Sequence, residues 1–337
     1  MMLKRVTIID IANRVGLSKS TVAYAFSSRD SGKVSSKNLV RIQAAAEALG
    51  YRANRAAKVL RSGRSRTVGI LFPAPYSPFY AALLSSLQKV IYASGYMGSF
   101  AFWEDCEGQK KATEMVLSQQ LEGIITVEPG VLPGDLPFPV VTYYNADARF
   151  DGVIHDFSHA LNSVFGYLVE LGHRRIGHIS REPGTARTRC FMENIRSRGF
   201  LLQPEWLYTH SLGGDNFALG YQGMQAILRS RPLPTALFAH DDQIALGALR
   251  AALEAGLRVP EDLSIIGYDD IPGASYSTPS LTTFGLGEDV SCADLLWKSL
   301  LHRISNPAAP RKEYLLKPVL MKRESCSFAR KEEKIQS

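Results

Sequence analysis

The segment VTIIDIANRVGLSKSTVAYAFSS, residues 6–28, predicts two short helices separated by a tight turn. The apolar residues of its first half recur at helical spacing: they are Ile8, Ile11, Ala12 and Val15. Thr7 followed three positions later by Asp10 resembles a capping box, which marks the start of the first helix. Gly16 ends that helix, and Ser18 is a good N-cap for the next one. The segment is therefore expected to fold as helix, turn and helix.

A second and a third helix complete a small all-α domain. Val22, Ala25 and Phe26 give the second helix an apolar face. The residues left pointing outward are Lys19, Ser20, Ala23 and Tyr24. A third helix is expected to begin at Ser35 or Ser36 and to stop at Gly50, and its inward residues are Leu39, Ile42, Ala46 and Leu49. Two short helices joined by a glycine turn and closed by a third form a helix-turn-helix module.

Positive charge is concentrated at the N-terminal end. Residues 1–66 carry 14 lysine and arginine residues against Asp10, Asp30 and Glu47, a net charge of +11, whereas the remaining residues carry a net charge of −4. A short basic module on a longer, mildly acidic globule indicates a head that binds a polyanion, nucleic acid first of all. The alternative is a basic surface that is merely solvated.

The outward face of the second helix suits a DNA groove. We expect this face to lie in the major groove, where Lys19, Ser20 and Tyr24 would read base edges. The alternative is that these three residues are ordinary solvated positions on a small three-helix domain. The next stretch, YRANRAAKVLRSGRSRT (residues 51–67), is rich in Arg and Lys and reads as a linker able to form a short helix.

From Thr67 onward, short β-rich runs alternate with helical patterns, as in parallel α/β sheets. The expected strands are TVGILF, GSFAFW, GIITVE and PVVTYY in a first series, and RIGHIS, TALFAHD and LSIIGYD in a second. The expected fold class is therefore an α/β two-lobed core with two doubly wound parallel sheets, behind an N-terminal all-α helix-turn-helix domain. A ligand is expected in the cleft between the lobes, beyond the carboxyl ends of the strands.

Enzyme signatures are missing from the sequence. It contains no GxSxG elbow, no P-loop and no GxGxxG after a strand. His155 and His159 have the spacing of a metal pair, but VIHDF reads as a strand leading into a helix, which separates the two rings. His240 beside two aspartates resembles an acid–base cluster without a nucleophile. We therefore expect no enzyme, no cofactor and no metal, and keep an enzyme and a stand-alone solute-binding protein as alternatives.

The chain shows no pattern of export or membrane insertion. No apolar run approaches the length of a membrane span, and no signal-peptide pattern opens the sequence. The four cysteines have no metal-ligand spacing and are expected to be reduced. A cytoplasmic protein without a membrane partner is therefore expected.

Several segments resemble the lac-repressor (LacI-type) family of bacterial transcription regulators. Residues 6–28 and the segment VSSKNLVRIQAAAEALGYRANRAAKVLRSGRS resemble the DNA-binding head and hinge of that family. The effector-binding core of the family, which is similar to periplasmic sugar-binding proteins, is resembled in order by PYSPFY, LGHRRIGHI, RTRCF, the long run from ALFAHDDQIALGALRAALEAG to STPSLTTF, and KPVLMKRES. The resemblance ends near Ser325.

The resemblance implies a set of DNA contacts. The implied DNA-binding residues are Thr7, Ser18, Lys19, Ser20, Thr21, Tyr24, Asn54, Ala57 and Leu60. In the family, a leucine from each of two paired hinge helices wedges into a base step of the minor groove, and Leu60 stands at that position with Ala57 at the close helix contact. Two departures are Tyr24, where the family usually has Arg, and Ala53, where it usually has Pro before the hinge helix.

The resemblance also implies an effector site. Its implied residues are Ser77, Phe79, Trp103, Arg181, Arg187 and Asp242. Arg187 and Asp242 stand for the ligand Arg and Asp of the family, and the alternative is a structural ion pair between them. The departures are Asp241 for Asn, Cys190 for Gly and Asp215 at an often aromatic stacking position. Trp103 or Tyr144 would supply a stacking surface instead, and the alternative is that each belongs to the core or the rim. A sugar or sugar derivative is the first expectation, and a carboxylate or phosphate ligand would suit Arg181 and Arg187.

The expected organisation follows the family. The expected domains are residues 1–50 (helix-turn-helix), 51–66 (hinge), 67–157 plus 290–318 (first lobe), 158–289 plus 319–325 (second lobe) and 326–337 (flexible tail). A homodimer is expected to bind pseudo-palindromic, double-stranded operator DNA as a regulator, a repressor first of all. A small-molecule effector in the cleft would switch the affinity for the operator.

Overall fold

The computed structural model describes most of the chain. The described residues are 6–26, 31–51, 63–74, 77–127, 130, 132–210, 215–287 and 291–330. They belong to two compact units, Met1–Ser65 and Arg66–Ser337, and each unit has its own hydrophobic core. Within the described part of the chain, no helix is long and apolar enough to cross a membrane.

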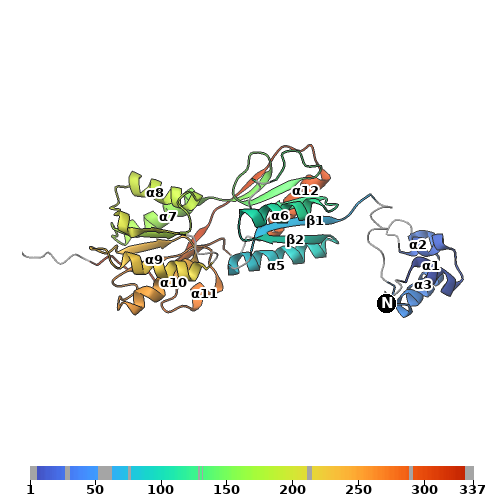
Figure 1. Ribbon diagram of the computed structural model, residues 1–337, viewed down its shortest axis with the longest axis horizontal. Helices are drawn as coiled ribbons and strands as arrows, with labels where there is room; N and C mark the ends of the chain where they lie inside the picture. Colours follow the sequence, from blue (N-terminus) through green and yellow to red (C-terminus); the bar gives the residue numbers. More distant parts are fainter. Residues whose placement is uncertain are drawn as a thin grey trace, which may run out of the picture. The chain divides into compact units, whose positions relative to one another are not determined.

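The N-terminal unit is the expected helix-turn-helix. Its elements are α1 (Ile8–Val15), α2 (Lys19–Ala25), the 3-10 turn η1 (Ser31–Lys33) and α3 (Ser36–Ala48), and Figure 1 shows the three α-helices packed together. Gly16 ends α1 with a φ of 68°, a left-handed conformation that glycine adopts without strain. Ile11, Val22 and Ile42 supply one fully buried side chain from each helix, so the apolar spacing in the sequence correctly identified the core.

The larger sheet defines the first lobe. Its strands are β1 (Thr67–Pro73), β2 (Met97–Trp103), β3 (Gly123–Thr126), β4 (Val140–Tyr144), β5 (Asp151–His155) and β11 (Glu313–Leu316). They are hydrogen-bonded in the order β11-β5-β4-β3-β1-β2, and all pairs are parallel. Because β1 lies between β2 and β3, the strand order reverses there, and the carboxyl end of β1 is a switch point of the kind at which α/β proteins bind ligands.

Helices cover both faces of the first-lobe sheet. On one face, α5 (Pro78–Ala93) and α12 (Cys292–Ser305) bury side chains such as Leu87 and Leu300. On the other face, α6 (Cys106–Leu117) buries Val116 against β1 and β3. The sheet has an apolar layer on each side, which explains why its strands read as nearly continuous hydrophobic runs.

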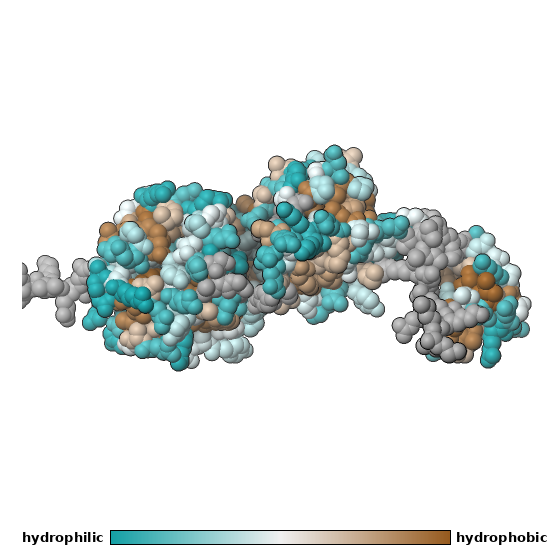
Figure 2. Space-filling view, in the orientation of Figure 1, coloured by the Kyte–Doolittle hydropathy of each residue, from teal (hydrophilic) through white to brown (hydrophobic). Residues whose placement is uncertain are grey.

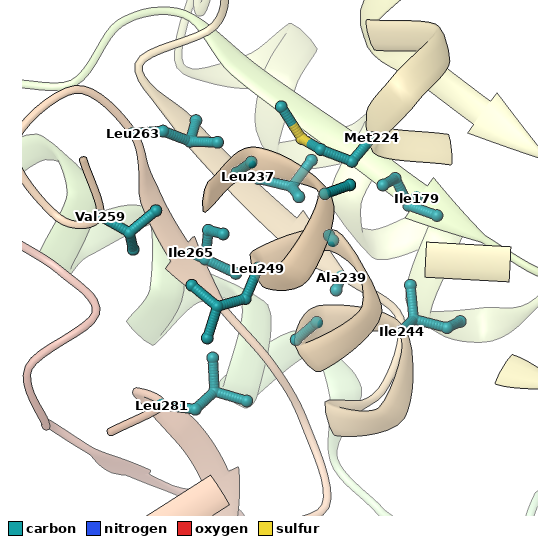
Figure 3. Packing of buried hydrophobic residues seen from close by; sticks show 14 of the residues in the cluster. Ile179, Met224, Leu237, Ala239, Ile244, Leu249, Val259, Leu263, Ile265 and Leu281 are labelled. Atoms are coloured by element: carbon teal, nitrogen blue, oxygen red, sulfur yellow. The ribbon is translucent and has the colours of Figure 1, made fainter. Parts of the chain in front are cut away.

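The second lobe is built the same way on a smaller sheet. Its strands are β6 (Ile176–Ser180), β7 (Leu207–Thr209), β8 (Ala236–Ala239) and β9 (Ser264–Ile266), all parallel in the order β7-β6-β8-β9. Its helices are α7 (Phe157–Glu170) and α8 (Ala186–Ser197) on one face, and α9 (Asn216–Ile227) and α10 (Asp242–Glu254) on the other. Figure 3 shows Leu237 and Ile265 of the sheet among Met224 of α9 and Leu249 of α10. The strand order reverses at β6, next to β8.

The chain passes between the lobes more than once. After the short elements η3 (Pro204–Trp206) and α11 (Pro272–Tyr276) in the second lobe, α12 and β11 return to the first lobe. Strands β10 (Thr283–Gly285) and β12 (Val319–Met321) form an antiparallel pair that the sequence patterns did not predict. The expected fold class is confirmed: an all-α helix-turn-helix unit is followed in the chain by two doubly wound parallel sheets.

The start of the expected tail is bound to the second lobe. Cys326 and Ser327 hydrogen-bond to Ile265 and Ser264, and the Ala329 amide donates to the carbonyl of Leu171 over 2.8 Å. Residues 326–330 therefore differ from the expectation of a flexible tail, because these backbone and side-chain bonds hold them against β9 and the end of α7. Residues 331–337 lie outside the described residues.

Candidate functional site

The exposed face of α2 carries the side chains expected to read DNA. Lys19 and Ser20 are exposed in the first turn, and Tyr24 is exposed one turn later. The Lys33 ammonium lies 5.2 Å from the centroid of the Tyr24 ring, within the range of a cation–π contact. This face is polar, carries positive charge and is free of core packing, as a groove-reading helix requires.

Ser18 and Thr21 hold the start of α2. The Ser18 hydroxyl accepts the amide of Thr21 over 3.1 Å and lies 2.8 Å from the hydroxyls of both Ser20 and Thr21. Thr7 does similar work at α1, because its amide and its hydroxyl both donate to the Asp10 carboxylate over 2.7 Å. The structure therefore gives Ser18, Thr21 and Thr7 capping roles at the starts of α1 and α2. Helix N-termini favour anions, so a contact between these residues and DNA phosphates stays a prediction.

Three predicted DNA contacts cannot be placed. Asn54, Ala57 and Leu60 of the expected hinge lie outside the described residues, as does Ala53. The wedge assigned to Leu60 stays a prediction.

The second candidate site lies at the switch point of the second-lobe sheet. The loop after β6 leads into α8, whose first turn carries Arg187, and the loop after β8 carries His240 and Asp241. The Thr188 hydroxyl bonds to Ser180 and to Thr185 within 3.1 Å, which fastens the start of α8 to the end of β6. These bonds fix the position of Arg187, which is buried, with only 5% of its surface exposed.

The Arg187 guanidinium is the centre of this site. Nη1 donates to the carbonyl of His240, and Nη2 donates to the hydroxyl of Tyr144 at the end of β4 in the first lobe. The guanidinium also lies 4.3 Å from the ring centroid of Tyr268 and 5.7 Å from that of Phe157. One buried cation therefore touches both lobes and is surrounded by aromatic rings.

Asp269 is the carboxylate that faces Arg187, and the sequence reasoning missed it. Its Oδ1 lies 3.9 Å from Nη1 of Arg187. Burial raises the pKa of Asp269 to about 7, against the opposing effect of the Arg187 charge. A signal existed in the sequence, because Asp269 is the last residue of the predicted strand LSIIGYD and so stands at a carboxyl end, where ligands bind.

The structure does not bring Asp242 to Arg187. Asp242 is fully buried, and its carboxylate accepts the hydroxyl of Thr283 and the amide of Ile271, the latter over 2.9 Å. It therefore ties α10 to the segment after β9. The expected pairing of Arg187 with Asp242 as ligand groups, or as an ion pair, is replaced by the pairing of Arg187 with Asp269.

The neighbouring acidic departures have structural partners. Asp241 caps α10 by accepting the amide of Ile244 and also accepts the side-chain amide of Asn216 over 2.8 Å. Asp215 caps α9 through the amide of Ala218 over 2.9 Å. Neither carboxylate supplies a stacking surface.

The first lobe contributes an aromatic wall. Ser77 caps α5 by accepting the amide of Phe79 over 3.3 Å, and the Phe79 ring stacks 6.4 Å from the ring of Tyr143. Trp103 instead packs with β1, β3 and α6 in a separate cluster, so the structure does not bring it to Arg187. Arg181 is exposed on the loop after β6. Of the two expected stacking residues, Tyr144 contacts Arg187 and Trp103 does not.

His155 lies between the two lobes. Its Nε2 is 2.9 Å from the Tyr143 hydroxyl, and its Nδ1 is 3.4 Å from the hydroxyl of Tyr268 in the second lobe. Burial, helped by the Arg187 charge, lowers the pKa of His155 to about 3, so the ring is neutral near pH 7. His159 is exposed on α7, and the part of the chain that the structure describes holds no cluster of three or more His, Cys, Asp or Glu able to bind a metal.

Two families match the chain. The family described as bacterial regulatory proteins, lacI family, matches residues 7–54, and the family described as a periplasmic binding protein-like domain matches residues 165–326. The HTH-type transcriptional repressor PurR of Klebsiella pneumoniae is 30% identical over 336 residues, which cover 95% of this chain and 96% of the relative. PurR of Photorhabdus laumondii is 29% identical over 334 residues, with the same coverage.

Solved structures share the fold. The lac repressor dimer bound to operator and the anti-inducer ONPF superposes with a TM-score of 0.82 at 23% identity, covering 96% of this chain and all of that one (100%). A LacI family transcriptional regulator from Enterococcus faecium with bound ribose superposes with a TM-score of 0.68 at 24% identity, covering 78% of this chain and 100% of that one. Similarity therefore extends over both units.

Proposed function

The chain belongs to the lacI family of bacterial regulatory proteins, and we propose that it is a transcriptional repressor whose affinity for operator DNA is set by a small molecule bound between its lobes. The observation that carries the proposal is Arg187, a buried cation with partners in both lobes. A ligand that bonds to Arg187 necessarily acts on the contact between the lobes. The exposed polar face of α2 supplies the DNA-reading surface in the same chain.

The effector site offers groups suited to hydroxyls. The guanidinium of Arg187 is a planar donor fork, and the Asp269 carboxylate is an acceptor beside it. Aromatic rings such as that of Tyr268 lie beside the guanidinium and would cover the apolar face of a sugar ring. The E. faecium regulator, a fold neighbour, holds ribose. We therefore infer a sugar or sugar derivative as the effector. The second candidate is a sugar acid or phosphate, which the exposed Arg181 at the same loop favours.

Coupling to DNA follows from the lobe contact. If the effector prefers one arrangement of the lobes, it shifts the population toward that arrangement and changes how the two heads of a dimer meet the operator. Such couplings are typically about 1–3 kcal/mol, which corresponds to a change of about 5- to 150-fold in operator affinity.

The oligomer we propose is a homodimer on a pseudo-palindromic operator. Large apolar side chains are exposed on the second lobe, among them Tyr276 (88% exposed) and Phe217 (45%), and Phe217 lines a groove between α9 and α10. Figure 2 shows hydrophobic patches among the mostly hydrophilic side chains of the visible surface. A second copy is the proposed occupant of this face, because two-fold symmetry matches two heads to two half-sites. The related lac repressor structure is a dimer.

We propose that the protein acts by binding DNA and an effector, and that it does so in the cytoplasm, where the bacterial chromosome lies. Its family consists of regulators, and the residues of the candidate site act as hydrogen-bonding groups without a nucleophile. The small molecule that the proposed function requires is the effector, which binds between the lobes.

Selection of bound sites from a random DNA pool tests the function. The full-length protein is incubated with the pool at one fixed salt concentration, with and without a panel of sugars and sugar acids. A pseudo-palindromic site that is lost or gained with one compound is the expected result. Recovery of no preferred sequence under any condition would remove the regulator role and leave a small-molecule binder.

A further inference from the structure

Tyr144 makes the contacts within the effector site that a ligand ring would make. Its hydroxyl accepts a hydrogen bond from Nη2 of Arg187, and its ring lies 5.5 Å from the guanidinium carbon. The ring centroid is 4.6 Å from that of His155 and 5.1 Å from that of Phe157. A flat ring is therefore held between aromatic neighbours, with its hydroxyl on a buried cation.

The backbone of Tyr144 is in an unfavourable conformation. Its φ is 76°, in the left-handed region that bulky residues rarely adopt. Such backbone conformations persist where surrounding contacts hold them, and they concentrate at binding and switch positions. The contacts that hold this one are the Arg187 hydrogen bond and the ring packing, so loss of those contacts removes the reason for the strained backbone.

Two residues that contact Arg187 each carry a buried polar atom that Tyr144 leaves unsatisfied. Among the residues that the structure describes, His240 Nδ1 and Asp269 Oδ1 have no hydrogen-bond partner. His240 is 3% exposed, and its backbone carbonyl accepts a hydrogen bond from Nη1 of Arg187. Asp269 Oδ1 lies 3.9 Å from the same nitrogen, too far for a hydrogen bond. A buried polar atom without a hydrogen-bond partner destabilises the protein by its desolvation penalty. A ligand that hydrogen-bonds to both atoms removes this penalty, which adds to the free energy of binding.

We propose that Tyr144 is an internal occupant of the effector site: its hydroxyl bridges the lobes through Arg187, and an effector displaces it by placing a ring-borne hydroxyl on Arg187 while bonding to His240 and Asp269. This inference rests on the proposed function, since it names the step by which the effector acts on the lobe contact. The bridge between β4 of the first lobe and α8 of the second is broken when Tyr144 leaves.

Chemical rescue tests the occupancy without knowledge of the effector. Tyr144→Gly removes the side chain, suits the left-handed backbone and leaves a slot that p-cresol, the tyrosine side chain with one hydrogen added, can fill. Full-length Tyr144→Gly is expected to bind p-cresol, and to bind it at least about 10-fold more tightly than toluene, the advantage of a hydrogen bond to a charged donor. Wild type and Tyr144→Phe, whose slots are filled, are expected to bind neither probe. Equal binding of p-cresol and toluene by Tyr144→Gly would overturn the role of the hydroxyl.

Operator binding then tests the regulatory part. We expect Tyr144→Gly to differ from wild type in operator affinity, Tyr144→Phe to differ in the same direction by less, and p-cresol to return Tyr144→Gly toward wild type. Thermal unfolding of each variant checks that it is folded. An operator affinity that p-cresol leaves unchanged in Tyr144→Gly would overturn the proposal while the proposed function stands. Failure of wild type itself to select any operator would instead overturn the proposed function, and the regulatory role of Tyr144 with it.

Discussion

Gly220 of α9 lies directly against the backbone of Ile244 in α10. A Cβ at Gly220 would sit 2.7 Å from the carbonyl carbon of Ile244 and closer still to its oxygen. Gly247 of α10 makes the reciprocal approach to the backbone of α9 at Phe217. The two helices that cover one face of the second-lobe sheet therefore cross at a distance that only glycine permits.

Gly220→Ala is expected to destabilise the protein. The added methyl group meets backbone atoms, which cannot rotate away, so the helices must separate at a cost of about 1–3 kcal/mol or more. The matched control is Gly166→Ala in α7, where a Cβ would meet nothing within 4 Å and the gain in helix propensity is worth about 0.5–1 kcal/mol. Urea unfolding of both variants measures the difference, and a Gly220→Ala protein as stable as Gly166→Ala would contradict the close crossing.

The buried ion pair of Arg303 and Asp151 joins α12 to the first-lobe sheet. Nη2 and Nε of Arg303 lie 2.6 and 2.9 Å from the two carboxylate oxygens of Asp151, and the side chains are 14% and 4% exposed. Arg303→Met is expected to cost about 3–5 kcal/mol, because it leaves the buried Asp151 carboxylate without its charged partner and with the hydrogen bond from the Lys312 amide.

The control is a solvent-exposed ion pair in α10, formed by Arg250 and Glu254, whose side chains are 71% and 40% exposed. Arg250→Met is expected to cost about 0–1 kcal/mol, since water already solvates both charges. The free energy of unfolding from denaturant titration decides. Similar losses for both variants would mean that burial at Asp151 does not govern the energy of the pair.

The sequence identified the helix-turn-helix and the alternation of strands and helices, because both depend on the local spacing of apolar residues. It paired Arg187 with Asp242 instead of Asp269, for a reason that is not local. Two Asp-Asp pairs stand at the ends of predicted strands, beginning at Asp241 and at Asp269. Which of their side chains faces Arg187 depends on contacts between segments far apart in the chain, and these bring Asp269 to Arg187. The same holds for β10 with β12, short strands whose pairing joins segments far apart in the chain.

Asp269 gives the stability of the protein a specific pH dependence. Its pKa is raised to about 7 from a usual value of 3.8, so the native state favours the protonated form. The stabilising contribution of that proton is complete below about pH 4 and is lost as the pH rises through about 7, a change of a few kcal/mol at most. Asp269→Asn lacks this titration. Relative to Asp269→Asn, wild type is therefore expected to lose stability between pH 5 and pH 8.

The comparison isolates Asp269 because the other titrating groups are common to both proteins. The pKa values of His155 and His178 are lowered to about 3 and about 4 by burial, so these residues act in the opposite sense and make each protein less stable as the pH falls below about 6.5. Denaturant unfolding of the pair at several pH values gives the difference directly. A difference that does not vary with pH would show that Asp269 titrates at its ordinary pKa.

The last prediction concerns base reading by α2. Lys19→Ala and Tyr24→Ala each remove an exposed side chain without touching the core, which is formed by residues such as Val22 on the opposite face. If these side chains contact base edges, each loss weakens binding to the selected site by about 1–3 kcal/mol and relaxes the preference at particular base pairs. Site selection with each variant, at the salt concentration used for wild type, measures both effects.

Lys37→Ala is the matched control, because it removes the same charge from the exposed start of α3 in the same unit. A charge that acts only on phosphates weakens binding to all sequences alike and lowers the slope of affinity against salt. We therefore expect Lys37→Ala to leave the selected sequence unchanged and Lys19→Ala to alter it. If both variants weakened binding uniformly, α2 would serve for attachment to the DNA backbone, and sequence would have to be read by other parts of the chain.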